Sequence, residues 1–151
     1  MSSEGANALV DHLGKALKSG SLDGTVHTSS STSTTFTISE LHYFEYKDLI
    51  DRSISNNHGQ VIDFTDGSRV VFRLSSQGVS MVRMYVERYV PAIAGPAELV
   101  RPAAEGLKGL IEVALEISKL KEFLGRDQPT VITVSYCHPY VDMTMSNLFH
   151  K

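Results

Sequence analysis

The chain has 151 residues, of which 42% are hydrophobic and 21% charged, a composition typical of one globular domain that can bury a core. Its formal net charge of -3 at pH 7 argues against a nucleic-acid partner, which normally binds a basic surface. Cys137 is the only cysteine, which excludes an intrachain disulfide and a multi-cysteine metal site, and no apolar run approaches the roughly 20 residues of a membrane span. We therefore expect a soluble, cytoplasmic protein with no nucleic-acid and no membrane partner.

The N-terminal region predicts a helix followed by a loop. Apolar residues at three- and four-residue intervals predict the helix over about 5–18, and Gly20 would end it. In the Ser/Thr-rich stretch 25–35, hydroxyl side chains compete for backbone hydrogen bonds, so we expect its first half to be a mobile loop. Residues 29–33 could also accept phosphate from a kinase. An extended segment is expected to begin at about Phe36.

The middle of the chain predicts three strands. Alternating apolar residues on both sides of the turn signal Asp66-Gly67 indicate a hairpin with strands at about 60–64 and 68–75. Residues 81–89 alternate in the same way and predict a third strand. The two faces of this third strand carry Val82, Met84 and Val86 on one side and Arg83, Tyr85 and Glu87 on the other.

The C-terminal region predicts a long amphipathic helix over about 103–124, with Gly125 as its C-terminal cap. The apolar stripe that defines its buried face consists of Leu107, Leu110, Val113, Ile117, Leu120 and Leu124. The β-branched segment 130–136 could add a strand or an extended tail. The order of the elements indicates an α+β domain, in which helices pack on one face of a mainly antiparallel sheet.

Two arginines flank the loop between the second and third predicted strands. If these strands are antiparallel neighbours, the guanidinium groups of Arg73 and Arg83 both reach the mouth of this loop. Two guanidinium groups, together with small loop residues that expose backbone N–H groups, suit a phosphate. The candidate phosphate-binding residues are Arg73, Ser75, Ser76, Gln77, Gly78 and Arg83. Alternatively, the arginines form surface ion pairs with the carboxylates of Glu87, Asp63 or Asp66.

Three stretches of the sequence are more specific than any short motif. GANALVDHLGKAL lies at 5–17, YFEYKDLIDRSISNNHGQVIDFTDGSRVVFRLS at 43–75, and GLIEVALEISKLKEFLGRDQPTVIT at 109–133. In this order they resemble the last domain of the eukaryotic-type phosphoglucomutases, members of the α-D-phosphohexomutase superfamily. The resemblance implies a phosphoglucomutase C-terminal-like domain over 1–133, followed by an extension at 134–151 of unknown role.

The resemblance implies a specific role for the loop. In that family four domains surround one cleft, and a mobile loop of the last domain, R-x-S-G-T-G-S-x-G-A-T-I-R, grips the phosphate of the sugar phosphate. Matched to this loop, the sequence places Arg73 and Ser75 at its start and Arg83 at its end. Gln77 stands where the family has threonine, Gly78 matches a glycine, and the loop is two residues shorter. The expected function is therefore a phosphate-binding, cleft-closing domain of an enzyme of carbohydrate metabolism, an isomerase that interconverts glucose 1-phosphate and glucose 6-phosphate.

The sequence lacks the family's phosphoserine loop, metal loop and sugar-recognition loop, so we expect the chain to be inactive by itself. No cofactor is expected in this chain, although the resemblance implies Mg²⁺ and glucose 1,6-bisphosphate for a complete enzyme. No metal site is expected either, because the six histidines have no spacing typical of metal ligands. The expected partners are a hexose phosphate, bound weakly through its phosphate, and the missing mutase domains, with this chain being a fragment, a split chain or a decayed paralogue. The alternative is a non-catalytic interaction module of the same fold with a degenerate phosphate loop.

Overall fold

The computed structural model describes residues 4–44, 46–47, 50, 54–55, 59–75, 81–99, 101–125, 128, 131–137 and 142–149. Its helices within these residues are α1 (Glu4–Ser19), α2 (Pro96–Leu99), α3 (Ala103–Ser118) and α4 (Leu120–Leu124), with a 3-10 helix, η1, at Ala92–Ala94. The strands are β1 (Val26–Thr28), β2 (Thr35–Tyr43), β3 (Tyr46–Lys47), β4 (Ile54–Ser55), β5 (Gln60–Phe64), β6 (Arg69–Ser75), β7 (Met81–Tyr89), β8 (Val131–Cys137) and β9 (Asp142–Phe149).

Within the described residues, seven strands form one sheet in the order β1-β2-β5-β6-β7-β9-β8, and every neighbouring pair is antiparallel. The turn between β5 and β6 contains Gly67, whose φ of 87° is a left-handed conformation that favours glycine. The short strands β3 and β4 pair with each other, apart from this sheet. The strands predicted at 60–64, 68–75 and 81–89 are therefore confirmed to within one residue.

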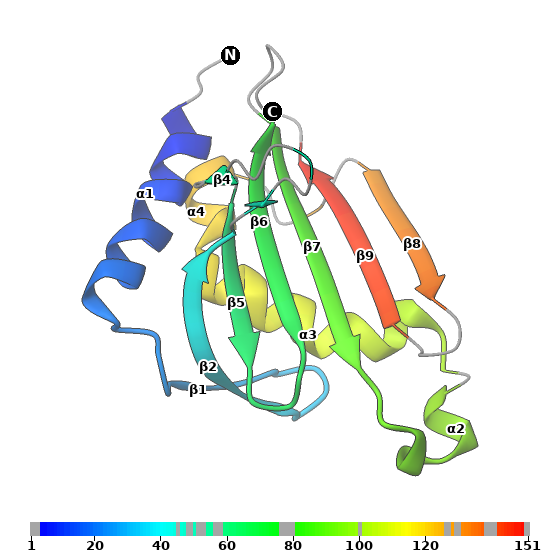
Figure 1. The fold of residues 1–151 in the computed structure, drawn as a ribbon. Helices are drawn as coiled ribbons and strands as arrows, with labels where there is room; N and C mark the ends of the chain where they lie inside the picture. The colour runs from blue at the N-terminus through cyan, green and yellow to red at the C-terminus, as the bar shows by residue number, and fades with distance from the viewer. Residues whose placement is uncertain are drawn as a thin grey trace.

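Helices α1, α3 and α4 lie together on one face of the sheet (Figure 1). Leu9 and Leu13 of α1 are fully buried, as the spacing of its apolar residues predicts. Alternate residues of β6 and β7 form the opposing layer of the core, namely Val70, Phe72, Val82, Met84 and Val86. Burial of each large apolar side chain stabilises the fold by about 1.5–3 kcal/mol. The predicted α+β class is confirmed, and the sheet face turned away from these helices is called the outer face below.

The long helix predicted over 103–124 is interrupted at Lys119. Lys119 adopts a left-handed conformation, with φ 52° and ψ 32°. The interruption redirects the last turn, α4, and the ring of Phe123 packs against His12 of α1 with centroids 5.5 Å apart. An apolar stripe continues across such an interruption, so the periodicity could not reveal it. The stripe itself is buried as predicted, and Gly125 ends α4 with a φ of 66°.

The Ser/Thr-rich segment 25–35, expected to begin as a mobile loop, forms β1, a turn and the start of β2. Ser29 is buried, and its hydroxyl donates to Oε2 of Glu112 in α3. Ser31 donates to the same oxygen from its hydroxyl at 2.9 Å and from its backbone N–H at 3.2 Å. These hydrogen bonds, led by that of Ser29, hold the pKa of the Glu112 carboxyl below its usual range. The segment is thus held against α3, because the carboxylate of Glu112, distant in sequence, accepts hydrogen bonds from the hydroxyl groups of Ser29 and Ser31.

The C-terminal strands widen the sheet beyond β7. Strand β9 pairs with β7 along nearly its whole length, and β8 pairs with the other side of β9. Of the two alternatives for the β-branched segment 130–136, a strand or an extended tail, the structure has the strand, at Val131–Cys137. Because β8 continues past residue 133, backbone pairing extends into the segment 134–151. The domain boundary at residue 133 stays a prediction.

Candidate functional site

Arg73 and Arg83 lie directly opposite each other on adjacent antiparallel strands, β6 and β7. Their sequence neighbours Phe72 and Met84 are buried in the core, so both arginines point to the outer face. Residues directly opposite in an antiparallel pair have Cβ atoms about 4.5–5.5 Å apart, and like charges placed there are destabilising. Arg83 is exposed and Arg73 is half-buried. The register therefore places the two arginines at adjacent positions of the outer face, two residues from the loop end of β6 and β7.

The loop between these strands is described only at its ends. Ser75 is the last residue of β6, and its backbone pairs with Met81 at the start of β7. The predicted phosphate-binding residues Ser76, Gln77 and Gly78 lie outside the described residues. The strand ends thus place Arg73, Ser75 and Arg83 at one loop mouth, and the assignment of all six residues to phosphate binding stays a prediction.

Arg73 has two neighbours that the sequence patterns did not single out. Its guanidinium carbon lies over the ring of Phe44, 5.7 Å from the ring centroid, which is within the range of a cation–π interaction. Gly59 passes close to the same side chain, because a Cβ atom at Gly59 would lie 2.8 Å from Cγ of Arg73. Phe44 and Gly59 are themselves joined by a 2.8 Å hydrogen bond from the Phe44 N–H to the Gly59 carbonyl. These contacts join residues distant in sequence, and neither residue lies in a periodic pattern.

The alternative ion pairs would need carboxylates close to Arg73 and Arg83. Asp63 pairs instead with Arg69 at 3.0 Å and with His42 at 2.7 Å, and Asp66 accepts the backbone N–H of Ser68 at 2.8 Å. The third candidate, Glu87, lies opposite Arg69 in the register of β6 and β7. The three carboxylates therefore belong to the end of the hairpin that is remote from the loop.

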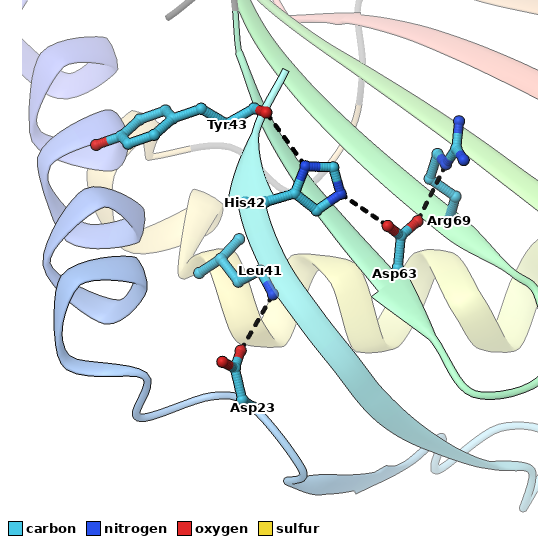
Figure 2. A network of polar contacts seen from close by, with 6 residues as sticks. All are labelled: Asp23, Leu41, His42, Tyr43, Asp63 and Arg69. Carbon is cyan, nitrogen blue, oxygen red and sulfur yellow. Dashed lines mark hydrogen bonds and ion pairs between the residues drawn. The ribbon is translucent and has the colours of Figure 1, made fainter. Parts of the chain in front are cut away.

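Figure 2 shows that His42 joins β2 to Asp63 of β5, and Asp63 in turn joins Arg69 of β6. Nε2 of His42 lies 2.7 Å from Asp63 Oδ2, and Nδ1 lies 3.1 Å from the carbonyl oxygen of Tyr43. Both partners are acceptors, so the ring satisfies both only when it is doubly protonated. Burial lowers the pKa of His42, but the hydrogen bonds to Asp63 and Tyr43 and the charges of Asp63 and Glu40 outweigh it and raise the pKa above 6.5. His42 therefore links β2 to β5 through Asp63, and both of its ring nitrogens are engaged in hydrogen bonds.

An open depression of about 630 Å³ adjoins this network. It is lined by Leu17, Glu40, Leu41, His42, Tyr43, Phe44, Val61 and Arg69. Along the adjoining edge of β2, Oδ1 of Asp23 accepts the backbone N–H of Leu41 at 3.1 Å, as Figure 2 shows. This bond occupies a backbone donor that an added strand would otherwise use.

The described residues show neither a metal site nor a membrane-spanning helix. Among those residues, no group of three or more His, Cys, Asp or Glu side chains is placed so that it could hold a metal ion. None of the helices described is both long enough and apolar enough to cross a bilayer.

Comparisons with known proteins agree with the resemblance found in the sequence. The family described as Phosphoglucomutase-1, C-terminal domain, matches residues 1–130. Phosphoglucomutase-1 of Dictyostelium discoideum is 41% identical over 131 residues, which cover 85% of this chain and 22% of the relative. The cytoplasmic phosphoglucomutase of Mesembryanthemum crystallinum is 46% identical over 92 residues, which cover 60% of this chain and 15% of the relative. Relatives named as chloroplastic phosphoglucomutases also match.

A solved structure extends this likeness to the fold. The open form of the exocytosis-sensitive phosphoprotein pp63/parafusin, a phosphoglucomutase from Paramecium, superimposes with a TM-score of 0.60 at 31% sequence identity. The match covers 85% of this chain and 20% of that structure. The chain thus spans about a fifth of the length of the relatives that it matches over most of its own length.

Proposed function

Because this chain belongs to the family of phosphoglucomutase C-terminal domains, we propose that it binds the phosphate of a hexose phosphate through Arg73 and Arg83. In the same proposal, the loop between these arginines closes one side of an active-site cleft, with Ser75, Ser76, Gln77 and Gly78 supplying hydroxyl, amide and backbone N–H donors. The rest of the cleft would come from domains of the kind that make up the remaining length of the relatives.

The observation that carries the proposal is the direct opposition of the two arginines in the register of β6 and β7. Two cations at opposite positions repel each other. A phosphate between them would accept charge-assisted hydrogen bonds from both, and these attractions would outweigh the repulsion. Guanidinium groups suit this role, because each presents planar pairs of N–H donors that match phosphate oxygens. The site also lies at a loop mouth, where backbone N–H groups can approach the anion.

The affinity of this chain for phosphate should be weak. One side of the cleft offers only part of the contacts that a complete site would make, and the loop must be ordered when the ligand binds. A dissociation constant in the millimolar range, about 4 kcal/mol of binding free energy, is the expected order of magnitude.

Interconversion of glucose 1-phosphate and glucose 6-phosphate is proposed only for an assembly that contains the missing domains. The described residues provide no carboxylate cluster suited to Mg²⁺, so we derive no step through this metal. The chain by itself should give no turnover above a buffer blank when glucose 1-phosphate, Mg²⁺ and a bisphosphate primer are supplied in a coupled assay. The cytosol is the proposed location, which the name of the Mesembryanthemum relative supports and which cell fractionation would test.

A chemical-shift titration with glucose 6-phosphate tests the proposal. Backbone amides of residues 74–83 should shift in a saturable way in the parent chain, and the response should flatten in Arg83→Ala. Arg69→Ala is the matched control, because it removes an arginine from the neighbouring strand β6 at the end of the hairpin remote from the loop. Glucose without phosphate should cause no shift. Salt should weaken the response, because the site is exposed.

Two results would contradict the proposal. The first is a parent chain whose amides do not move at high ligand concentration. The second is a double variant, Arg73→Ala with Arg83→Ala, that responds as the parent does. Either result would favour the alternative, a non-catalytic module that keeps the fold and has lost phosphate binding.

A further inference from the structure

Strand β2 is paired along only part of one of its sides. On this side β1 pairs with Thr35–Thr37, and the backbone of Ile38 is bonded to the segment that precedes β1. Beyond the bulge between Ile38 and Glu40, no strand in the described part of the chain pairs with this side of β2. The remaining residues, from Glu40 to Tyr43, therefore form an edge of the sheet, which is called the β2 edge below.

The hydrogen bonds of the strand decide which backbone groups face this edge. The Phe44 N–H donates to the carbonyl of Gly59, at the end of the pairing with β5. Successive residues of an antiparallel strand direct their N–H and C=O groups to opposite sides, so those of His42 face β5 and those of Leu41 and Tyr43 face the β2 edge. Such a row of backbone groups is a template for pairing with another chain.

Asp23, in the segment between α1 and β1, binds at this edge. Its Oδ1 accepts the Leu41 N–H at 3.1 Å, as Figure 2 shows. Because the Asp23 side chain belongs to an exposed residue, a charged carboxylate occupies the position where an incoming strand would place its carbonyl oxygen. Charged side chains at an edge are one means by which natural sheets avoid edge-to-edge pairing.

The surface beside the β2 edge would favour pairing with a second copy of the chain. The open depression of about 630 Å³ at this edge is lined in part by Leu17 and Phe44, which are half-buried. Two antiparallel edges of the same sequence match each other under two-fold symmetry, and their pairing would remove these apolar side chains from water. Each copy would, however, also bring an Asp23 carboxylate to the shared edge, where like charges repel.

From these contacts we propose that Asp23 blocks the β2 edge and thereby keeps the chain from pairing with a second copy through this strand. This inference goes beyond the proposed function and does not depend on phosphate binding. If Asp23 only fixed the segment after α1 to β2, its replacement would change stability and leave the association state unchanged. The association state therefore distinguishes the two roles.

Hydrogen exchange in the parent chain tests the state of the edge without any variant. The Leu41 amide should be protected by Asp23, whereas the Tyr43 amide should exchange much faster than the Phe44 amide, which is bonded to Gly59. In dilute solution, Asp23→Ala should speed the exchange of Leu41 by about ten-fold and leave that of Phe44 unchanged. A Tyr43 amide as protected as the Phe44 amide would mean that the edge is already covered and would overturn the inference.

Sedimentation over a range of protein concentrations tests the association. Asp23→Ala should form a dimer that the parent lacks, in a fraction that rises with concentration. Asp11→Ala is the matched control, because it removes an exposed carboxylate from α1 and changes the net charge equally. Asp23→Lys also lacks the acceptor for Leu41, so it has the same loss of stability, but it keeps a charge at the edge and should associate no more than the parent.

Pairing through β2 also has a local signature. The Tyr43 amide of Asp23→Ala should become protected as the concentration rises, because its N–H then donates to the second copy. A folded Asp23→Ala in the same association state as the parent contradicts the inference, and so does association that leaves the exchange of Tyr43 unchanged. Equal association of Asp23→Ala and Asp23→Lys would trace it to lost stability, which also overturns the inference.

Discussion

The two faces of the sheet differ in the interactions of their side chains, which are apolar packing on one face and contacts between charged groups on the other. On the face covered by α1, α3 and α4, five side chains of β6 and β7 are apolar and buried, namely Val70, Phe72, Val82, Met84 and Val86. The outer face has the buried pair Val61 and Val71 at its centre and charged groups towards both ends. At one end Asp63 pairs with Arg69, whereas at the other Arg73 opposes Arg83.

This difference separates the residues that pack the core from the residues to which we assign the proposed phosphate binding. The helix-covered face consists mainly of packed apolar side chains, so a charge added there should lower the free energy of unfolding. On the outer face, Asp63 pairs with His42 and Arg69 at one end, and Arg73 lies opposite Arg83 in the register at the other end. The opposition of these two arginines is the observation on which the proposed phosphate binding rests.

The largest expected effect is the introduction of charge into the helix-covered face. Ile117 is 5% exposed within the apolar stripe of α3, so Ile117→Asp would bury an unpaired carboxylate. We expect the free energy of unfolding to fall by several kcal/mol, about 3–5, or the chain to fail to fold. Chemical denaturation measures this, and Glu116→Asp, on the exposed side of the same helix, should stay within about 0.5 kcal/mol of the parent. Equal stability of Ile117→Asp and the parent would mean that the packed face is wrongly assigned.

Two glycines in α1, Gly5 and Gly14, differ in how closely the neighbouring residues approach them. A Cβ atom at Gly5 would overlap the backbone carbonyl of Phe123, whereas one at Gly14 would meet its nearest neighbour, Tyr43 Oη, at an ordinary 3.5 Å. Gly5→Ala should therefore lower the free energy of unfolding by about 1–3 kcal/mol. Gly14→Ala should raise it by up to about 1 kcal/mol, because alanine favours the helix interior. Thermal unfolding of both variants checks the contrast, which fails if Gly5→Ala is the more stable of the two.

A smaller effect is expected at the compensated end of the outer face. The folded-state pKa of His42 is raised, so its contribution to stability is complete below its unfolded pKa of about 6.5 and is lost as the pH rises through the folded value. The contribution should be at most about 1 kcal/mol, because the side chain is 41% exposed. His42→Gln should flatten the dependence of the unfolding free energy on pH in this window. Asp63→Asn should flatten it too, since it removes the main acceptor.

The sequence predicted the packed face well, because that face depends on periodicity. Strand β7 and the helix α1 were predicted nearly residue for residue, and the register that opposes Arg73 to Arg83 follows from a hairpin with a short loop. The interruption at Lys119 was not predicted, because the apolar stripe continues through it and leaves no break in the periodicity.

The outer face was predicted only in part, for a related reason. The pattern placed two arginines on it but could not supply the partners that β2 brings, Phe44 against Arg73 and His42 against Asp63. Similarly, Glu112 fixes the Ser/Thr-rich segment from a helix about 80 residues away. Contacts between side chains distant in sequence leave no local pattern, whereas burial of one face does.

The central proposal is that an anion binds between the opposed arginines Arg73 and Arg83. Arg83→Glu tests it, because this change converts the like-charged pair with Arg73 into an oppositely charged pair. In chloride buffer, urea denaturation should show Arg83→Glu more stable than the parent by about 0.2–1 kcal/mol. Phosphate at about ten times the dissociation constant should then stabilise the parent by about 1.4 kcal/mol and the variant much less. An Arg83→Glu variant that is less stable than the parent in chloride, or that gains as much from phosphate, would contradict the account.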